Sequence, residues 1–408
     1  MEFVDGDSLE CLQLGPLLGT GKSMDSMFLM ATWPYSVTHK LKKNNERVEN
    51  TTWLPVVKRI AESLKLCQTG VDEYGDPLTP GGHRFTVWGI TGDNEHHANF
   101  FGCPHWSMRE WCGNCDCNKT TKDGLVISKK RKYKEYEVGH KPSTSPIMDV
   151  PGMCSSTVED DTLHDLFTHG VCSHLMGSAL HTMIYKEGKG KQKTPPVMRL
   201  SMIFQRIKDI CKKRKIQCPL SNISLSNIHT PDKPHGCYPF FKAKGHHTKE
   251  LLPIVAKVVE LSSDGSDMHC KRSEALNSLS EFCALMDRVG HVPSNSQADR
   301  ARELFEKFAE SYEWLNAWAK KKHRMLFKIV HKHHYTWHMS KKFKFLNPKL
   351  TSTFKGEDYV GQVSLMGNNC SRGKSRLLVA SALSEKYREH MHLRLTRGDF
   401  LDMIVDSF

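Results

Sequence analysis

The sequence predicts an α/β protein in which a mixed-sheet core is interrupted by a large, mostly helical insertion. Three observations lead to this fold class. Residues 85–90 are strand-like and mostly apolar, and they end in a small turn followed by Asp93. Residues 197–340 look mainly helical by the spacing of their apolar side chains. With 408 residues, 38% of them hydrophobic, the chain is long enough for two or three domains.

Local patterns predict the elements of the first part of the chain. The stretch MFLMATW indicates a strand, and residues 52–66 place apolar side chains at near-helical spacing. The Pro and Gly content of residues 75–83 predicts a loop. A strand at 85–91 then leads into Asp93, and a helix is expected at 94–101.

The remaining elements follow from composition and helix-start signals. Polar, basic residues rich in Ser and Pro at 116–156 predict an exposed excursion. A helix is expected from the aspartates near residue 161 to residue 180, because acidic side chains suit a helix N-terminus. A flexible link follows, and the clearest later helix begins after VPSNS. We predict four segments: core 1–115, excursion 116–160, helical insertion 161–340, and a return to the core at 341–408.

Composition narrows the class of protein. No apolar run approaches the roughly 18 residues of a membrane span, so we expect no membrane association. The first residues, MEFVDGDS, lack the basic and apolar regions of a secretory signal. The 14 cysteines are therefore expected to be mainly reduced thiols inside the cell.

Positive charge is concentrated in one long stretch. The net charge is +13, and residues 314–356 contain ten Lys and one Arg but no Asp or Glu. This pattern predicts a polyanionic partner, with DNA the first candidate, whereas the alternative is a solvated face. The expected DNA-binding residues are Lys320, Lys321, Lys322, Arg324, Lys328, Lys332, Lys341 and Lys342.

Two cysteines have the spacing of half a zinc site. Cys112 and Cys115 form CGNC, and no second CxxC exists in the chain. The candidates to complete a structural Zn²⁺ site are Cys103, Cys117, His105 and His164. The alternative is a turn that carries two buried thiols.

Two pairs of residues that include histidine lie at helical spacing. Asp161 and His164 would share one helix face, where the ring could meet the carboxylate or a shared metal. The alternative is a helix-start aspartate beside a partly buried histidine. His334 and His338 lie at i and i+4, but HYTWH lacks the glutamate of a zinc-protease helix. We expect these histidines to face the basic groove or to pack beside Trp337, and a zinc hydrolase is the weaker alternative.

Two acidic residues could serve phosphoryl chemistry. Asp93 follows the predicted strand, and Glu357 is the first acid after the basic stretch. Clustered carboxylates can hold two Mg²⁺ or Mn²⁺ ions for strand transfer, while basic neighbours hold the phosphate backbone. The alternatives are that Asp93 caps the following helix and that Glu357 is a counter-charge.

The order of these features resembles the DDE transposases of the CACTA (En/Spm-like) group. It runs from the strand before Asp93 to CGNC, then DTLH, a helical insertion, and finally NPK and FKGEDYVG. The resemblance implies an RNase H-like core, Asp93 as the second catalytic aspartate, and Glu357 as the final glutamate. It also implies that Cys112 and Cys115 match the family's CxxC motif, and that Asp161 and His164 match its DxxH motif.

The resemblance further implies Mg²⁺- or Mn²⁺-dependent cleavage and transfer of DNA strands, a nuclear location, and a homo-oligomer as a second kind of partner. The family's first catalytic aspartate has no assignable counterpart, because Asp5 and Asp7 lie in a different local context. The competing prediction is a non-catalytic nucleic-acid-binding protein stabilised by zinc.

Overall fold

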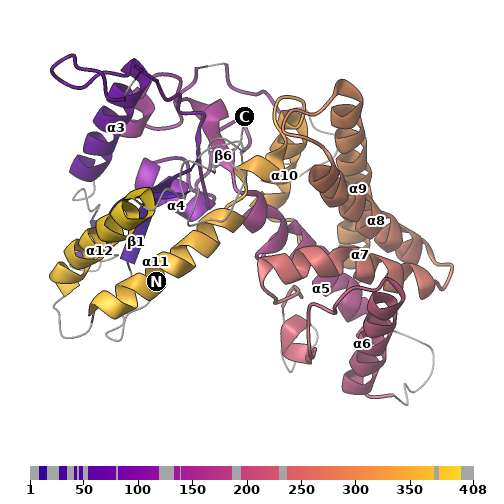
Figure 1. Cartoon of the computed structure of the whole chain (residues 1–408). Coiled ribbons are helices and arrows are strands. Elements are labelled where there is room, and N and C mark those ends of the chain that lie inside the picture. The colour runs from indigo at the N-terminus through magenta and orange to yellow at the C-terminus, as the bar shows by residue number, and fades with distance from the viewer. Residues whose placement is uncertain are drawn as a thin grey trace. The chain divides into compact units, whose positions relative to one another are not determined.

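A computed structural model describes most of the chain (Figure 1). The described residues are 9–15, 27–34, 41–43, 46–48, 54–79, 81–118, 133–137, 139–185, 194–228, 237–371 and 376–396. They form two compact units. Unit 1 comprises Met1–His105, Tyr136–Glu159 and Ser352–Phe408, and unit 2 comprises Trp106–Glu135 and Asp160–Thr351.

Unit 1 combines short strand pairs with helices. Its described elements are β1 (Leu9–Leu14), β2 (Phe28–Pro34), β3 (Leu41–Lys43), β4 (Glu46–Val48), α3 (Leu54–Thr69), β5 (Ile90–Gly92), α4 (Asn94–Phe101), β6 (Val158–Asp160, whose last residue falls in unit 2), α11 (Phe354–Ser371) and α12 (Arg376–Thr396). The 3₁₀ turns η1 (Pro146–Asp149) and η2 (Ser155–Thr157) precede β6. Strands β1 and β2 are antiparallel, as are β3 and β4, and β5 pairs with β6.

Two apolar clusters hold unit 1 together. In the first, the buried face of α3 packs with residues of η1, and partly buried side chains of β1, β2, β5 and β6 lie against them. In the second, Tyr359 and Val363 of α11 meet Leu383 and Tyr387 of α12. The backbone N–H of Leu29 in β2 donates to the Tyr387 hydroxyl at 3.1 Å, which fixes α12 on the hairpin.

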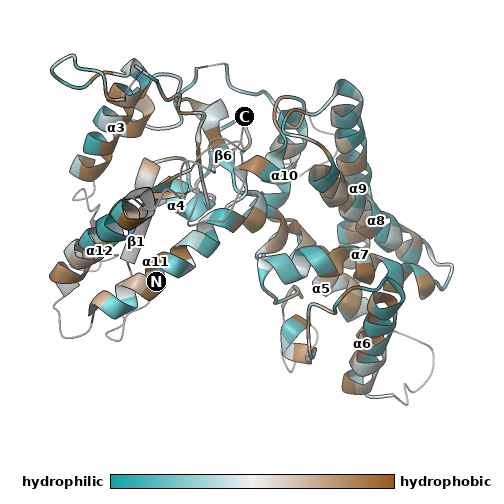
Figure 2. Ribbon diagram, viewed as in Figure 1, coloured by the Kyte–Doolittle hydropathy of each residue, from teal (hydrophilic) through white to brown (hydrophobic). Residues whose placement is uncertain are grey.

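Unit 2 is almost entirely helical. Its described elements are η3 (Leu163–Phe167), α5 (Val171–Ile184), α6 (Pro196–Lys213), η4 (Leu225–Ile228), α7 (Gly245–Leu261), α8 (Asp267–Arg288), α9 (Asn295–Lys321), α10 (His331–Lys342) and η5 (Pro348–Thr351). Helix α5 is buried along nearly its whole length, as an apolar-all-round helix should be, whereas α6 and α9 have one polar face (Figure 2).

One glycine permits the closest backbone approach in unit 2. A Cβ at Gly177 of α5 would lie 2.3 Å from the Cα of Phe240, so any larger residue would push the two segments apart. The amide of Phe241 donates to the Ser173 carbonyl at 2.8 Å across the same contact. The segment around residue 240 is thereby fixed against α5.

The structure is mixed α and β, as predicted, but helices dominate and the sheets of the described residues are two-stranded. The predicted strand at 85–91 was too long, since only Ile90–Gly92 forms β5. Val87 and Ile90, three residues apart, both pack toward the core, which is not the alternation of a strand. A Cβ at Gly89 would lie 2.4 Å from the carbonyl oxygen of Thr157. The chain therefore lies close against residue 157 just before β5 begins.

Other predicted elements differ in extent. The helices expected at 94–101 and after residues 292–296 are confirmed as α4 and α9, and Ser294 caps α9 through the amide of Gln297. The helix expected at 161–180 is instead η3 followed by α5. The helical backbone is interrupted between them at His169, which has φ 53°, and at Gly170, which packs on η3. Most of the predicted link (residues 186–193) and residues 119–132 of the predicted excursion lie outside the described residues. The rest of the excursion is not uniformly exposed as predicted, because Ile147, Met148 and Val150 are buried in the core of unit 1.

The two units divide the chain somewhat differently from the predicted segments. The helical unit takes up residues 106–115, expected in the core, and residues 341–351, expected in the return to the core. Both additions carry or adjoin the side chains that form the candidate site.

Candidate metal centre

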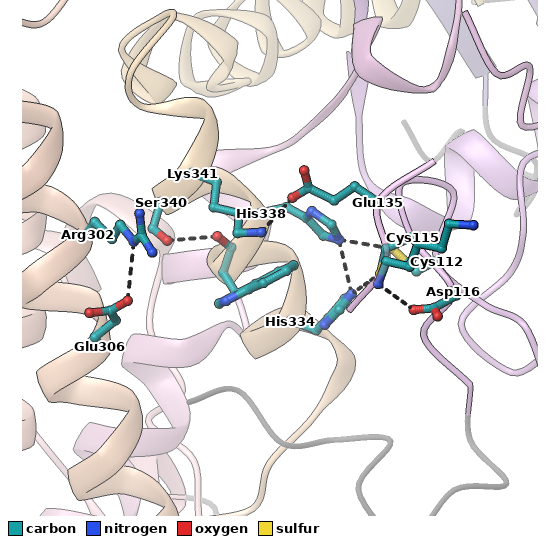
Figure 3. Close-up of polar contacts among 12 residues, drawn as sticks. Cys112, Cys115, Asp116, Glu135, Arg302, Glu306, His334, His338, Ser340 and Lys341 are labelled. Atoms are coloured by element: carbon teal, nitrogen blue, oxygen red, sulfur yellow. Dashed lines mark hydrogen bonds and ion pairs between the residues drawn. The ribbon is translucent and has the colours of Figure 1, made fainter. Parts of the chain in front are cut away.

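Four metal-binding side chains of unit 2 converge at one point (Figure 3). Cys112 and Cys115 come from the loop after Trp106, and His334 and His338 come from α10. The Cys112 Sγ lies 3.3 Å from Nε2 of His338, and the Cys115 Sγ lies 3.3 Å from Nε2 of His334. The two Nε2 atoms are 3.1 Å apart, and all four ligand atoms lie within 4.8 Å of one another.

This arrangement fits a tetrahedral metal ion. Ligand atoms around tetrahedral Zn²⁺ are separated by roughly 3.3–3.8 Å, given Zn–S and Zn–N bonds of about 2.3 and 2.0 Å. The three printed separations lie within a few tenths of an ångström of that range. All four residues are buried, and two thiols with two imidazoles favour zinc over the oxygen-seeking ions.

The CGNC segment is folded as a tight turn. The amide of Asn114 donates to the Cys112 Sγ at 3.4 Å, so the turn points its sulfur inward. The backbones of Cys115 and Glu135 form an isolated antiparallel β-bridge. The amide of Lys134 donates to Oδ1 of Asp116 at 2.9 Å. These bonds tie the loop to residues 133–135, although neither segment belongs to a regular sheet.

Helix α10 presents its two histidines on one face. His334 and His338 are one turn apart, so their rings point in the same direction. Near the C-terminus of the helix, Nζ of Lys341 lies 2.7 Å from a carboxylate oxygen of Glu135 and 3.9 Å from the ring centre of Trp337. The helix is thus attached to the same 133–135 segment as the cysteine turn.

Aromatic side chains surround His334. Its ring is stacked with Trp337 at 5.5 Å between centroids and meets Trp111 and Tyr133 edge-on at 4.9 and 4.7 Å. Trp111 is fully buried in this cluster. The packing holds the ring orientation and excludes water, which is what a structural metal site requires.

Electrostatics at the site favour the metal-binding form of one thiol. Burial raises the pKa of Cys112, but its hydrogen bond with Cys115 and the adjacent rings of His338 and His334 outweigh burial and hold that pKa well below its ordinary value. Burial lowers the pKa of His334, yet the neighbouring Cys112 raises it to about 9. Since the thiolate is the form that binds metal, Cys112 is prepared to act as a ligand.

A third thiol lies beside the four ligands. Cys117 is fully buried and is hydrogen-bonded with Cys115 and with His334. The hydrogen bond with Cys115 lowers the pKa of Cys117 to about 6. Cys117 therefore helps to orient Cys115 and His334 through these hydrogen bonds, and it is not one of the four candidate ligands.

The sequence predicted two of the four ligands and missed the other two. Cys112 and Cys115 are brought together, but the histidines that complete the set are His334 and His338 rather than His164. Cys103 and His105 belong to unit 1, whereas the site belongs to unit 2. The spacing of HYTWH carried the signal, and His334 does pack beside Trp337 as expected. The histidines face the cysteines instead of a basic groove.

Asp161 and His164 contact each other, as their spacing predicted. Nδ1 of His164 is paired with Oδ2 of Asp161, and Oδ1 of Asp161 accepts the amide of Leu163 at 2.9 Å. Nζ of Lys332 donates to the carbonyls of His164 and Thr168 at 2.8 and 3.0 Å. The DTLH segment is thereby joined to α10, the helix that carries His334 and His338, and it is not part of the candidate four-ligand group.

Asp93 and Glu357 both belong to unit 1, at the starts of two helices. Asp93 follows β5 and caps α4, accepting the amide of His96 at 2.6 Å, which is the role named as its alternative. Glu357 lies exposed in the first turn of α11. Within the described part of the chain, neither joins a group of three or more ligands. Asp5 and Asp7 lie outside the described residues.

The predicted DNA-binding residues differ in exposure. Lys320, Lys321, Lys322 and Lys328 are exposed, whereas Arg324 and Lys342 are partly buried. Lys332 and Lys341 make the internal contacts described above, which explains their partial burial. Four of the eight are thus directly available to an external polyanion.

Comparisons of the chain with protein-family models, with curated proteins and with solved structures find no significant match. Among the described helices, none is both long and apolar enough to cross a membrane.

Proposed function

We propose that Cys112, Cys115, His334 and His338 hold a structural Zn²⁺. A catalytic zinc keeps one position open for water or substrate, but here four protein side chains supply four ligand atoms, the number that a closed structural site uses. The four residues are buried, and Trp111, Tyr133 and Tyr335 pack around the cysteines, so a reacting group has poor access to the site. A structural role is therefore favoured over a zinc hydrolase.

We further propose that the chain is a DNA-binding protein of the DDE transposase type. The observation that carries this proposal is the division of the chain. Asp93 and Glu357 are far apart in sequence yet belong to unit 1, and the helical unit lies between them in the chain. The resemblance implies this order, with a helical insertion ahead of the final glutamate and an RNase H-like core around it.

The charge of unit 2 supports DNA as the partner. Exposed Lys320, Lys321 and Lys322 end α9, and Lys328 follows in the segment before α10. The acid-free stretch that contains them leaves their charge uncompensated by sequence neighbours. Phosphates would be contacted irrespective of base sequence, so binding should depend on salt more than on sequence.

The geometry favours binding without strand cleavage. Two-metal chemistry needs several clustered carboxylates, and within the described residues neither Asp93 nor Glu357 joins a group of three or more metal-ligating side chains. Asp93 is also engaged as a helix cap. An active transposase is the second candidate, and the shared membership of Asp93 and Glu357 in unit 1 is the observation that favours it.

Salt-dependent DNA binding by the purified chain tests this proposal. We expect binding to duplex DNA with a log–log salt slope of roughly −3.6 if four exposed lysines each meet one phosphate. We expect no strand cleavage with Mg²⁺ or Mn²⁺. Absence of DNA binding would contradict the proposal, and cleavage that disappears in Glu357→Gln would establish the second candidate instead.

A further inference from the structure

An exposed tryptophan stands beside the metal centre. Trp106 begins the loop that carries Cys112 and Cys115, and this residue is 41% exposed to solvent. Its ring is stacked on His331, the first residue of α10, with centroids 5.3 Å apart and planes only 10° from parallel. The pair forms a flat aromatic surface where the two metal-binding segments meet.

The buried side of this pair is firmly held. The His331 ring meets Trp111 edge-on at 6.4 Å and Tyr335 edge-on at 5.8 Å. Trp111 is fully buried, so it belongs to the core of the metal centre. Trp111 and Tyr335 thus fix the His331 ring, and stacking on that ring holds Trp106 in a defined orientation.

Burial separates the two tryptophans of the loop by role. Trp111 contributes to packing, but Trp106 leaves much of a large apolar ring in contact with water, which is unfavourable in free energy. Packing alone gives no reason to expose it. A pre-oriented exposed ring instead suits a flat partner that can stack on it.

Positive charge close to the pair in sequence indicates which partner that is. His331 lies in the acid-free basic stretch, and exposed Lys328 is three residues before it. Arg109, on the loop itself, is exposed as well. Aromatic rings interleaved with cations are the pattern by which proteins bind single-stranded nucleic acid, with bases on the rings and phosphates on the cations.

We propose that Trp106, backed by His331, stacks on an unpaired base, so that this surface binds single-stranded or locally opened DNA. The inference rests on the DNA-binding function proposed above and adds the form of DNA that is preferred. Bases inside an intact duplex are stacked on one another and do not offer a free face. The tryptophan should therefore matter for single strands and little for duplexes.

The Trp106→Ala variant tests this directly on the full chain. Stacking on one base should make its loss cost roughly 5- to 100-fold in affinity for a single-stranded oligonucleotide. Duplex affinity should change by less than about twofold, and the salt slope should not change, because no charge is removed. Trp106→Phe should retain most of the single-strand affinity.

Trp88 offers a matched control. It is 49% exposed and belongs to unit 1, so Trp88→Ala removes the same kind of side chain from the other unit. We expect it to leave both affinities unchanged. Zinc content measured on each variant reports whether the metal centre is intact.

A second measurement avoids any folding defect in the variants. Wild-type protein is photo-crosslinked to a single strand carrying one 5-iodouracil, and the linked peptide is identified by mass spectrometry. A crosslink at Trp106 supports the proposal. Crosslinking confined to other aromatic residues overturns it.

Failure of this inference is distinguishable from failure of the proposed function. Wild-type protein that binds neither single strands nor duplexes overturns both. Wild-type protein that binds DNA, with equal affinities in Trp106→Ala, overturns the stacking role alone. An equal loss on both forms of DNA also contradicts it, and would favour Trp106 as a contact for another protein or as part of the fold.

Discussion

The Cys112→Ser variant is expected to bind less than about a tenth of an equivalent of zinc and to lose the structure around α10. The cysteine turn and residues 133–135 have few regular hydrogen bonds of their own, so the proposed metal would supply much of the free energy that holds them. Zinc binding contributes on the order of 10 kcal/mol to the folding of small zinc domains. Even a loss of about 4 kcal/mol would lower the melting temperature of a unit this size by roughly 8–16 °C.

Thermal unfolding followed by circular dichroism, together with metal analysis, measures both effects. Cys270→Ser is the matched control, because Cys270 is an exposed cysteine of the same unit, on α8. It should leave the zinc content and the melting temperature unchanged. If Cys112→Ser behaves like Cys270→Ser, the cysteine turn is only a packed pair of thiols.

Replacing Lys320, Lys321 and Lys322 together by Gln is expected to make DNA binding much less dependent on salt. Three phosphate contacts contribute a slope of about −2.7, so the variant should retain only the shallow remainder. The three lysines lie exposed at the end of α9, where their side chains are accessible to the phosphates of DNA. Fluorescence anisotropy with a labelled duplex at several salt concentrations gives the slopes.

A charge-matched variant elsewhere in unit 2 serves as the control. Lys212, Lys213 and Lys215 are exposed at the end of α6 and just after it. Their replacement by Gln removes the same charge and should leave the salt slope near that of the wild type. If this control flattens the slope and the α9 variant does not, the DNA-binding surface lies at α6.

Sequence patterns predicted the locally determined parts of the structure. The start of α9, predicted just after VPSNS, lies within about two residues of the observed one, because Ser294 and Gln297 satisfy amides at the helix end wherever the helix packs. The strand prediction failed at residues 85–89, because the packing of Gly89 against residue 157 depends on a segment that is distant in sequence. The short sheets also depend on such long-range pairing, and their extent was overestimated.

The candidate site shows the same limit. The CxxC spacing identified Cys112 and Cys115, since two ligands of one turn are encoded locally. His334 lies more than 200 residues further along the chain, and only folding brings it to Cys115. The HYTWH spacing places two imidazoles on one helix face, but it does not indicate that Cys112 and Cys115 complete the set of ligands.

Zinc K-edge X-ray absorption on the purified wild-type protein tests the central claim most directly. We predict about one equivalent of zinc per chain, with two sulfur neighbours at about 2.3 Å and two nitrogen neighbours at about 2.0 Å. Those neighbours would be Cys112, Cys115, His334 and His338. Less than about half an equivalent of tightly held zinc, or a shell of oxygen and nitrogen without sulfur, would contradict the metal centre described here.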